Sequence, residues 1–496
     1  MKGKTTMRYI ITKILGSVAI FAALSIGATV RAETIQTRIG PLSFTHDFAN
    51  GYPTKETVQK LYDERDFQRA CQLYLWALPI VAMEQAKEQA RTVFGAGDLD
   101  LGLSIGYAEV SGILTPNVVT PYMMGGPDLG KTGPLVIKVP AGPMAGVIDD
   151  CLQRPVTDLG LAGPDQGKGG KFLLLGPGQT APHNEGFIVV HSPTLNVIIF
   201  IRNLETDPEK AKQLQKQFRF YPYAQRDNPP ANRVLRSEGK KASQAQPRGL
   251  AYWERLAEIL NREPVQERDR IMMAMLRPLG IEKGKPFKPD ERQRKILTEA
   301  SLVGEAMAKA NDFDKRQMEL SYYKDGVQWH LSLCLDPSQE TKFYTQLDER
   351  AAWFYEAAMT SKGMVTKTPG VGQVYLGSYK DKDGNWLDGA NTYRLHVPPN
   401  APVKQFWSLT IYEVDTRSLI QNQQQIADRS SRQPDLVRNA DGSVDLYVGP
   451  TAPKGFEKNW IPSAPGRGWF AYFRLYAPTE AHFDRTWTLP DFVKVK

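Results

Sequence analysis

The sequence predicts a mainly β protein with helical insertions (α+β), arranged as two jelly-roll-like β-sandwiches joined by a helical segment. Residues 106–201 and 370–475 contain short apolar runs separated by Gly, Pro and Asn, a texture typical of antiparallel strands and turns. Between them, residues 251–359 carry apolar side chains at three- and four-residue steps, which indicates amphipathic helices. The gaps between predicted strands are too short for crossover helices, which argues against a parallel α/β sheet.

The first 32 residues have the pattern of a cleavable secretory signal peptide. A basic stretch precedes the apolar run 14–28, and small residues follow at Val30-Arg31-Ala32. Gly and Ser interrupt the run, and it is shorter than the roughly 20 residues that a spanning helix needs. We expect cleavage near Ala32 and a periplasmic or secreted protein without a transmembrane helix. An uncleaved membrane anchor is the alternative.

This segment also accounts for most of the net positive charge of the chain. The chain has 62 Lys+Arg against 54 Asp+Glu, and five of the basic residues but none of the acidic ones lie in the first 32 positions. The mature chain would therefore carry 57 basic and 54 acidic residues. A nucleic-acid partner requires a concentrated basic patch, and a net charge of +3 gives no support for one.

The elements follow in order along the mature chain. Thr54 precedes a predicted helix that Pro79 interrupts, and a second helix is predicted over 80–94. Strands are predicted in the first β region at 135–139, 171–175, 186–190 and 196–201, and in the second at 373–379, 392–397, 407–412, 444–448 and 470–475. The polar segment 226–248 is predicted to be a linker or surface loop. Helices are predicted at 251–261, 265–275, 290–309 and 341–359, the last with Phe343, Leu347, Phe354 and Tyr355 on a core-facing side.

The sequence gives no support for a metal or cofactor. Three cysteines, Cys71, Cys151 and Cys334, are too few and too scattered for a disulfide framework and lack metal-ligand spacing. The triplet His183-Asn184-Glu185 fits the H-x-E of zinc deaminases, but the required P-C-x-x-C is missing. The carboxylates Asp149, Asp150, Asp158 and Asp165 match no calcium loop, and we interpret them as solvated turn residues.

Three local motifs bear on catalysis or binding. Residues 102–106 fit the G-x-S-x-G pattern of a nucleophile elbow, but no buried strand is predicted before Ser104. The glycine-rich run 163–171 offers backbone N–H groups beside Lys168 and Lys171, which suits an anion; a tight turn into the next strand is the alternative. His183 lies in a loop between predicted strands, where an imidazole can act as a general acid or base or simply stabilise a turn.

The C-terminal region is rich in aromatic residues near amide and guanidinium groups. Asn459 is next to Trp460, and Arg474 lies two residues after Tyr472. Trp407 belongs to another predicted strand of the same region. Such sets bind sugars or flat polar ligands, but alternating strand aromatics more often fill a sandwich core.

Several of these motifs together resemble two bacterial families. The runs TPNVVTPY, GPLV and GPDQGKGGKFLLLGPG resemble the domain of unknown function numbered 1254, and FWSLTIY, DGSVDLYVGP, NWIPSAPG and FRLYAPTE resemble its usual companion, numbered 1214. The resemblance implies an exported, mostly β protein with a sandwich in each half, and it implies no particular activity. We expect boundaries at 33–235 for the first domain, 236–369 for the helical connection and 370–496 for the second domain.

Three functions fit these observations. The first is an exported, hydrolase-like enzyme acting on a small polar or sugar-like molecule, with His183 and Lys171 as catalytic residues. The substrate-binding residues predicted on loop position and on the resemblance are Asn117, Thr120, Tyr122, Lys168, Trp407, Asn459, Trp460 and Arg474. The alternatives are a non-catalytic ligand-binding protein and an envelope interaction scaffold. The expected partner is a small molecule, and homo-oligomerisation is left open.

Overall fold

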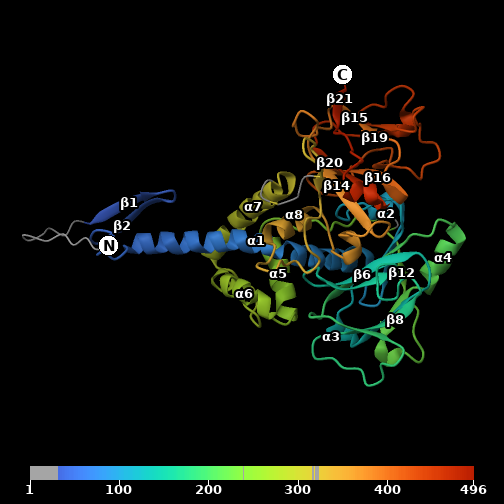
Figure 1. Ribbon diagram of the computed structural model, residues 1–496. Helices are drawn as coiled ribbons and strands as arrows, with labels where there is room; N and C mark the ends of the chain where they lie inside the picture. Colours follow the sequence, from blue (N-terminus) through green and yellow to red (C-terminus); the bar gives the residue numbers. More distant parts are fainter. Residues whose placement is uncertain (1–31, 238, 316–317, 319–322, 496) are drawn as a thin grey trace, which may run out of the picture. The chain divides into compact units, whose positions relative to one another are not determined.

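The computed structural model describes residues 32–237, 239–315, 318 and 323–495 (Figure 1). Apart from Ala32, the predicted signal peptide lies outside these residues. The chain divides into two compact units, Met1–Glu64 and Arg65–Lys496. The described part of the first contains an antiparallel hairpin that was not predicted, β1 (Glu33–Thr37) with β2 (Gly40–Phe44), and the beginning of helix α1 (Lys55–Phe94).

Helix α1 runs without interruption through Pro79, so the predicted break there is wrong. A proline inside a helix lacks the backbone N–H that would bond the carbonyl four residues earlier, here that of Leu75. Side chains from distant segments bond the helix backbone on both sides of that carbonyl: the Tyr252 hydroxyl donates to the Tyr74 carbonyl at 2.7 Å, and the Gln153 amide donates to the Pro79 carbonyl at 2.7 Å. Residues 73–83 of α1 are buried throughout, so packing maintains the helix where local propensity would end it.

The first β region consists of two sheets packed around an apolar core. The six-stranded sheet has the order β12 (Val234–Leu235), β3 (Leu101–Ser104), β4 (Tyr122–Gly125), β10 (Val197–Asn203), β6 (Met144–Asp150), β7 (Pro155–Gly160). The four-stranded sheet has the order β11 (Arg219–Pro222), β5 (Leu135–Val139), β8 (Gly170–Leu175), β9 (Ile188–His191). Alternate residues of β10, Ile199 and Ile201, point into this core with Phe172 and Ile137. The other face of the larger sheet, which carries Phe200 and Arg202, is therefore the outer face.

The second β region repeats this plan. Its five-stranded sheet has the order β13 (His330–Leu331), β14 (Gln373–Ser378), β20 (Trp469–Pro478), β16 (Val403–Glu413), β17 (Asp428–Ser430). Its four-stranded sheet has the order β19 (Trp460–Pro462), β18 (Val444–Gly449), β15 (Thr392–Val397), β21 (Val493–Val495). Pairing of Ser408 with Arg474 and of Thr410 with Tyr472 places these four residues on one face of the larger sheet. Phe473 lies on the opposite face, stacked on Trp407 with ring centroids 5.3 Å apart.

Helices connect and flank the two β regions. They are α2 (Gly106–Val110), α3 (Leu129–Thr132), α4 (Pro208–Gln217), α5 (Leu250–Arg262), α6 (Arg270–Leu276), α7 (Glu291–Phe313), α8 (Leu347–Glu356) and α9 (Glu480–Phe483). The helix predicted over 341–359 is only α8, and Phe343, which was assigned to its core-facing side, is 83 % exposed. The chain before α8 instead forms a turn in which the Thr341 hydroxyl accepts from the Phe343 and Tyr344 backbone N–H groups.

The predicted fold class, mainly β with helical parts, is confirmed, while the domain boundaries stay a prediction. The four aspartates predicted as solvated turn residues are not solvated. Asp149 and Asp150 are fully buried, and Asp158 and Asp165 are 5 % exposed, because each accepts backbone hydrogen bonds from neighbouring turns. None of the helices in the described ranges combines the length and hydropathy required to span a bilayer.

Candidate functional site

A cavity of about 60 Å³ lies between the outer faces of the two larger sheets. The first β region contributes Tyr122, Met124, Phe200 and Arg202, and the second contributes Tyr375, Tyr472 and Arg474. Helix α1, the 113–116 loop and the end of α8 close the remaining sides with Ala82, Met83, Ala86, Ile113, Leu114, Thr115, Pro116 and Trp353. The cavity therefore has apolar walls with two guanidinium groups and three phenols among its lining groups.

Arg474 is the most buried of these charges, with 2 % of its surface exposed. Its two terminal nitrogens donate to the Tyr412 hydroxyl at 2.6 Å, the Thr410 hydroxyl at 3.2 Å and the Thr115 carbonyl at 2.7 Å. All three acceptors are neutral. The Nε of Arg474 has no hydrogen-bond partner within the described ranges.

Arg202 enters the cavity from the opposite sheet and is partly buried. It donates to the Gln373 amide oxygen at 2.7 Å, and its guanidinium carbon lies 5.4 Å from the ring centres of both Tyr122 and Phe200. Its Nε also lacks a hydrogen-bond partner among the residues that the structure describes. Over the same residues, neither Arg202 nor Arg474 forms an ion pair, so two buried positive charges remain without a directly bonded counter-ion.

The phenols around these arginines do not neutralise them. Burial raises the pKa of Tyr476 to about 12, and burial likewise raises the pKa values of Tyr375, Tyr412 and Tyr472 above the ordinary value. These hydroxyls therefore stay protonated at neutral pH and offer only dipoles.

Two carboxylates stand behind the cavity wall. Asp428 pairs across the sheet with Thr410, and its pKa is raised to about 6 by burial although Arg429 and Arg474 oppose the shift. Glu356 at the end of α8 accepts a hydrogen bond from the Tyr472 hydroxyl and another, at 2.8 Å, from Tyr379. Burial, with the Asp312 carboxylate nearby, raises the pKa of Glu356 well above its usual range.

The buried Asp312 is itself compensated. Its carboxylate accepts from the Lys315 ammonium at 2.7 Å, and both side chains are fully buried. Lys315 pairs with Asp312, and burial favours the neutral form of Glu356. The Asp428 carboxylate interacts electrostatically with Arg474 but forms no ion pair with it among the described residues.

One turn supports the cavity from the first β region. The Tyr122 hydroxyl accepts from both the backbone N–H and the side-chain amide of Asn117, each at 2.8 Å. The Asn117 side-chain oxygen in turn accepts from the Thr120 N–H at 3.0 Å and hydroxyl at 3.1 Å. Thr115, whose carbonyl binds Arg474, has a φ of 37°, a left-handed conformation that a β-branched residue rarely adopts. The turn therefore holds a strained residue against the buried arginine.

Four of the sequence-predicted site residues meet here: Tyr122 and Arg474 line the cavity, and Asn117 and Thr120 hold Tyr122. Three others have packing roles. Trp407 is buried on the opposite face of its sheet, Asn459 bonds the backbone of Val437 and Asp445, and the Trp460 indole donates to the Gly449 carbonyl at 2.8 Å.

The remaining predictions lie elsewhere. Lys168, Lys171 and His183 are not among the residues that line the cavity. Lys171 is an exposed residue of β8, Lys168 belongs to the turn before β8, and His183 is exposed in a loop. At His183 it is the backbone that is bonded, its carbonyl accepting from the Tyr223 hydroxyl at 2.6 Å.

Sequence reasoning missed Arg202, Tyr375 and Glu356. Arg202 follows directly on the predicted strand 196–201, and its position two residues after Phe200 places it on the outer face. A charged residue continuing an otherwise apolar strand was the signal that could have found it. Tyr375 and Glu356 carried no such signal, because each lies in an ordinary strand or helix pattern.

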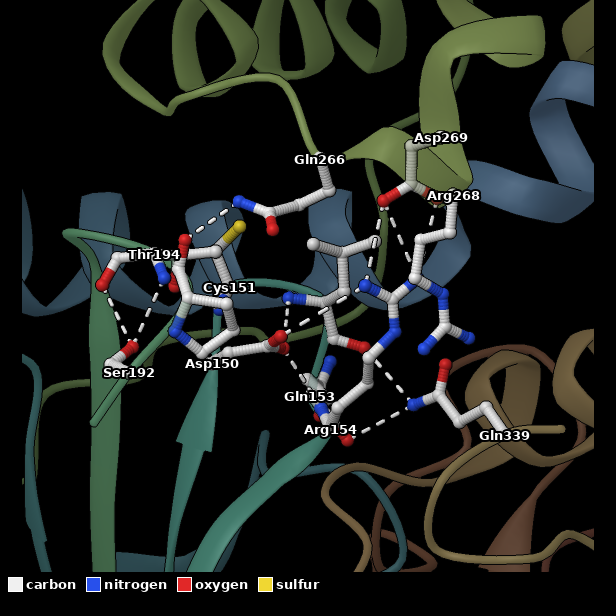
Figure 2. Close-up of polar contacts among 12 residues, drawn as sticks. Asp150, Cys151, Gln153, Arg154, Ser192, Thr194, Gln266, Arg268, Asp269 and Gln339 are labelled. Atoms are coloured by element: carbon white, nitrogen blue, oxygen red, sulfur yellow. Dashed lines mark hydrogen bonds and ion pairs between the residues drawn. The ribbon is translucent and has the colours of Figure 1, made fainter. Parts of the chain in front are cut away.

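A second polar cluster lies at the turn after β6 and has a structural role (Figure 2). Asp150 accepts from the backbone N–H groups of Leu152 at 2.8 Å and Arg154 at 3.0 Å, and the Arg154 guanidinium lies 3.3 Å from the Asp269 carboxylate. Figure 2 shows Gln339 reaching the same turn, where its amide donates to the Leu152 and Gln153 carbonyls at 3.2 and 3.1 Å. These contacts fasten the first β region to the helical segment. Within the described ranges, no group of three or more His, Cys, Asp or Glu side chains is placed to hold a metal ion.

The fold and cavity define a class of protein with two β-sandwich-like regions and a cationic, aromatic cavity between them. Residues 105–222 match the family model described as "Protein of unknown function (DUF1254)", and residues 372–480 match "Protein of unknown function (DUF1214)". Both predicted resemblances are therefore confirmed, in the predicted order along the chain. The cavity draws lining residues from both matched regions.

A solved structure shares the fold of this chain. The chain is similar to the VPA0106 protein of Vibrio parahaemolyticus, with 17 % identity, a TM-score of 0.55, and coverage of 87 % of this chain and 100 % of that one. It is also similar to a putative uncharacterized protein from Burkholderia cenocepacia, with 11 % identity, a TM-score of 0.40, and coverage of 88 % of this chain and 96 % of that one. No curated protein matches the chain.

Proposed function

We propose that the protein binds a small organic anion, a carboxylate or a phosphate, in the cavity between Arg202 and Arg474. One observation carries the proposal: two guanidinium groups, one from each β region, line a single cavity and have only neutral hydrogen-bond partners. A guanidinium group that is removed from water and bonded only to neutral groups is costly, and an anionic ligand would relieve that cost. Guanidinium groups also match carboxylate and phosphate oxygens in geometry.

Binding of short anions tests this proposal. Titration calorimetry of the purified protein with butyrate, benzoate and inorganic phosphate should give saturable binding to at least one of them. Arg474→Gln and Arg202→Gln should each weaken it at least tenfold, because a charge-assisted hydrogen bond is worth about 1.5–3 kcal/mol. Arg394→Gln, at an exposed position on β15, is the matched control and should bind like the wild type. Binding that survives both cavity substitutions would contradict the proposal.

A second candidate function is a hydrolase-like enzyme, and the Tyr472–Glu356 hydrogen bond is the observation that favours it. Tyr472 lines the cavity, and its hydroxyl donates to the Glu356 carboxyl group, whose pKa burial raises well above its usual range. Such a pair can hold a proton next to a bound molecule, as general acid catalysis requires. The test is turnover of ester, glycoside and phosphoester panels. If Tyr472→Phe lowers turnover while binding of the same anions is unchanged, the enzyme function is supported. Absence of turnover in the wild type leaves binding alone.

We also propose that the protein is exported, on the signal-like pattern of its first 32 residues. Amino-terminal sequencing of the protein recovered from a periplasmic or secreted fraction should begin near Glu33. Recovery only as the full-length chain in the membrane fraction would favour the uncleaved anchor instead.

A further inference from the structure

A second cavity, of about 210 Å³, adjoins the first and extends away from the two arginines. The two cavities share five lining residues, Ala86, Ile113, Met124, Ile198 and Gln244. Four of the five are apolar. A molecule that passes from one cavity to the other would therefore meet mostly methyl and methylene groups.

The interior of the second cavity continues this apolar character. Its walls include Ala90 and Phe94 of α1, Leu103 of β3, and Leu235 and Ala242 of the 235–244 segment. Glycines at 102, 112, 125 and 126 add backbone without side chains. Nothing in this set matches the guanidinium and phenol groups of the first cavity.

Charged residues also line the second cavity, and several of them have partners within the protein. Arg236 lies 2.6 Å from Glu109, and Lys131 lies 3.8 Å from Asp98. The buried Lys87 donates its ammonium to the Asn196 side chain, so its aliphatic stem is free to line the wall. Arg236 and Lys131 therefore have carboxylate partners, which Arg202 and Arg474 do not have among the described residues.

We infer that the ligand is amphipathic: an anionic head held by Arg202 and Arg474, followed by an unbranched apolar chain that crosses the shared wall into the second cavity. The inference rests on the proposed anion binding and adds the chemical class of the ligand. Straight-chain carboxylates and alkyl phosphates fit this description, because they place one charge at the end of a flexible apolar chain. A compact polar ligand such as a sugar would leave the second cavity unused.

Chain length is the variable that tests this inference. Affinity should be measured by titration calorimetry for straight-chain carboxylates from acetate to dodecanoate, and for the matching alkyl phosphates, below their micelle-forming concentrations. Each methylene that enters the apolar cavity should tighten binding about two- to fourfold, in line with the free energy of burying such a group. The two series also distinguish a carboxylate head from a phosphate head.

Ala90→Phe is the matching variant, because Ala90 of α1 lines the second cavity and is not among the residues that line the first, so its added ring would fill the space for the chain alone. It should leave acetate or butyrate binding within about twofold of the wild type and weaken the longest chains at least tenfold. Ala306→Phe, at an exposed position in α7, is the control for an added phenylalanine on a helix and should change neither. Circular dichroism verifies that both variants fold, and the chain-length series on the wild type tests the inference even if Ala90→Phe does not fold.

The outcomes separate the two proposals. If short anions bind through Arg474 but affinity is flat with chain length, the amphipathic ligand is ruled out while anion binding stands. If neither short nor long anions bind the wild type, the proposed function itself fails.

Discussion

The outer faces of the two larger sheets meet at the same cavity but differ in chemistry. The face of the first β region presents Ile198, Phe200 and Met124, with Arg202 as its charge. The face of the second presents hydroxyl groups around Arg474, from Tyr375, Tyr412, Tyr472 and Thr410. Their inner faces are alike, since both are filled with aliphatic and aromatic side chains.

This difference indicates which region recognises which part of a ligand. The hydroxyl groups of the second β region can form hydrogen bonds with the charged head of a ligand, whereas the first β region offers mainly apolar contacts. The second cavity follows the same division: it is lined by residues numbered between 86 and 244, and none of the lining residues belongs to the strands of the second β region. The first region is thus expected to set chain preference and the second to set head-group preference.

The largest expected effect comes from the inner face of β20. Phe473→Ala removes a fully buried ring that stacks on Trp407, and it should lower the free energy of unfolding by about 3–5 kcal/mol. Denaturant unfolding measures this loss, and the folded fraction should still bind anions. Arg474→Gln, one residue along on the outer face, should have the reverse profile, losing anion affinity with a smaller change in stability. Equal stability losses and equal binding losses for the two variants would remove the distinction between the faces.

A medium effect is expected at the turn that supports the cavity. Tyr122→Phe removes the acceptor of two Asn117 donors and leaves both buried, which should cost about 1–3 kcal/mol in thermal or denaturant unfolding. Tyr476→Phe is the matched control, since the Tyr476 hydroxyl has no hydrogen-bond partner among the described residues. A control that is as destabilising as Tyr122→Phe would refute the proposed role of the turn.

The smallest effect concerns pH. Because the pKa of Asp428 is about 6, its carboxylate is charged at pH 7 and neutral at pH 5, and its charge opposes an anion bound at the nearby Arg474. Affinity for an alkyl sulfonate, whose own charge is constant over this range, should rise about three- to tenfold as the pH falls from 7 to 5. Asp428→Asn should bind at pH 7 as the wild type does at pH 5 and show a flat profile. A wild-type affinity that falls on acidification would contradict this assignment.

Patterns of local origin were predicted well, and those that depend on distant contacts were not. The strands Leu135–Val139 and Thr392–Val397 appear where apolar runs between turn residues placed them. The predicted break at Pro79 failed because Tyr252 and Gln153, far along the chain, supply hydrogen bonds to that part of α1. The prediction that Phe343 lies on the core-facing side of a helix was also wrong, because a helical pattern in the sequence does not guarantee that a helix forms.

The candidate site shows the same limit. Tyr122 and Arg474 could be selected because polar motif residues in or near irregular segments need a reason beyond packing. His183 and Lys171 were selected on residue type and on their place in or beside a loop, and neither property carries information on which loops meet. Arg202 was missed because only the pairing of β10 with its neighbours shows that its side chain shares a cavity with Arg474.

The hydrogen bond between Arg474 and the Thr115 carbonyl joins residues 359 positions apart in the chain. The Tyr412 to Pro116 bond spans 296 positions, and the Tyr107 to Ile420 bond spans 313. Contacts of such separation carry a large loop-closure entropy and form late, after local structure has condensed. Neither half of the polypeptide would therefore possess the cavity when expressed alone, and during synthesis the buried arginine would find its acceptors only as the last strands were completed.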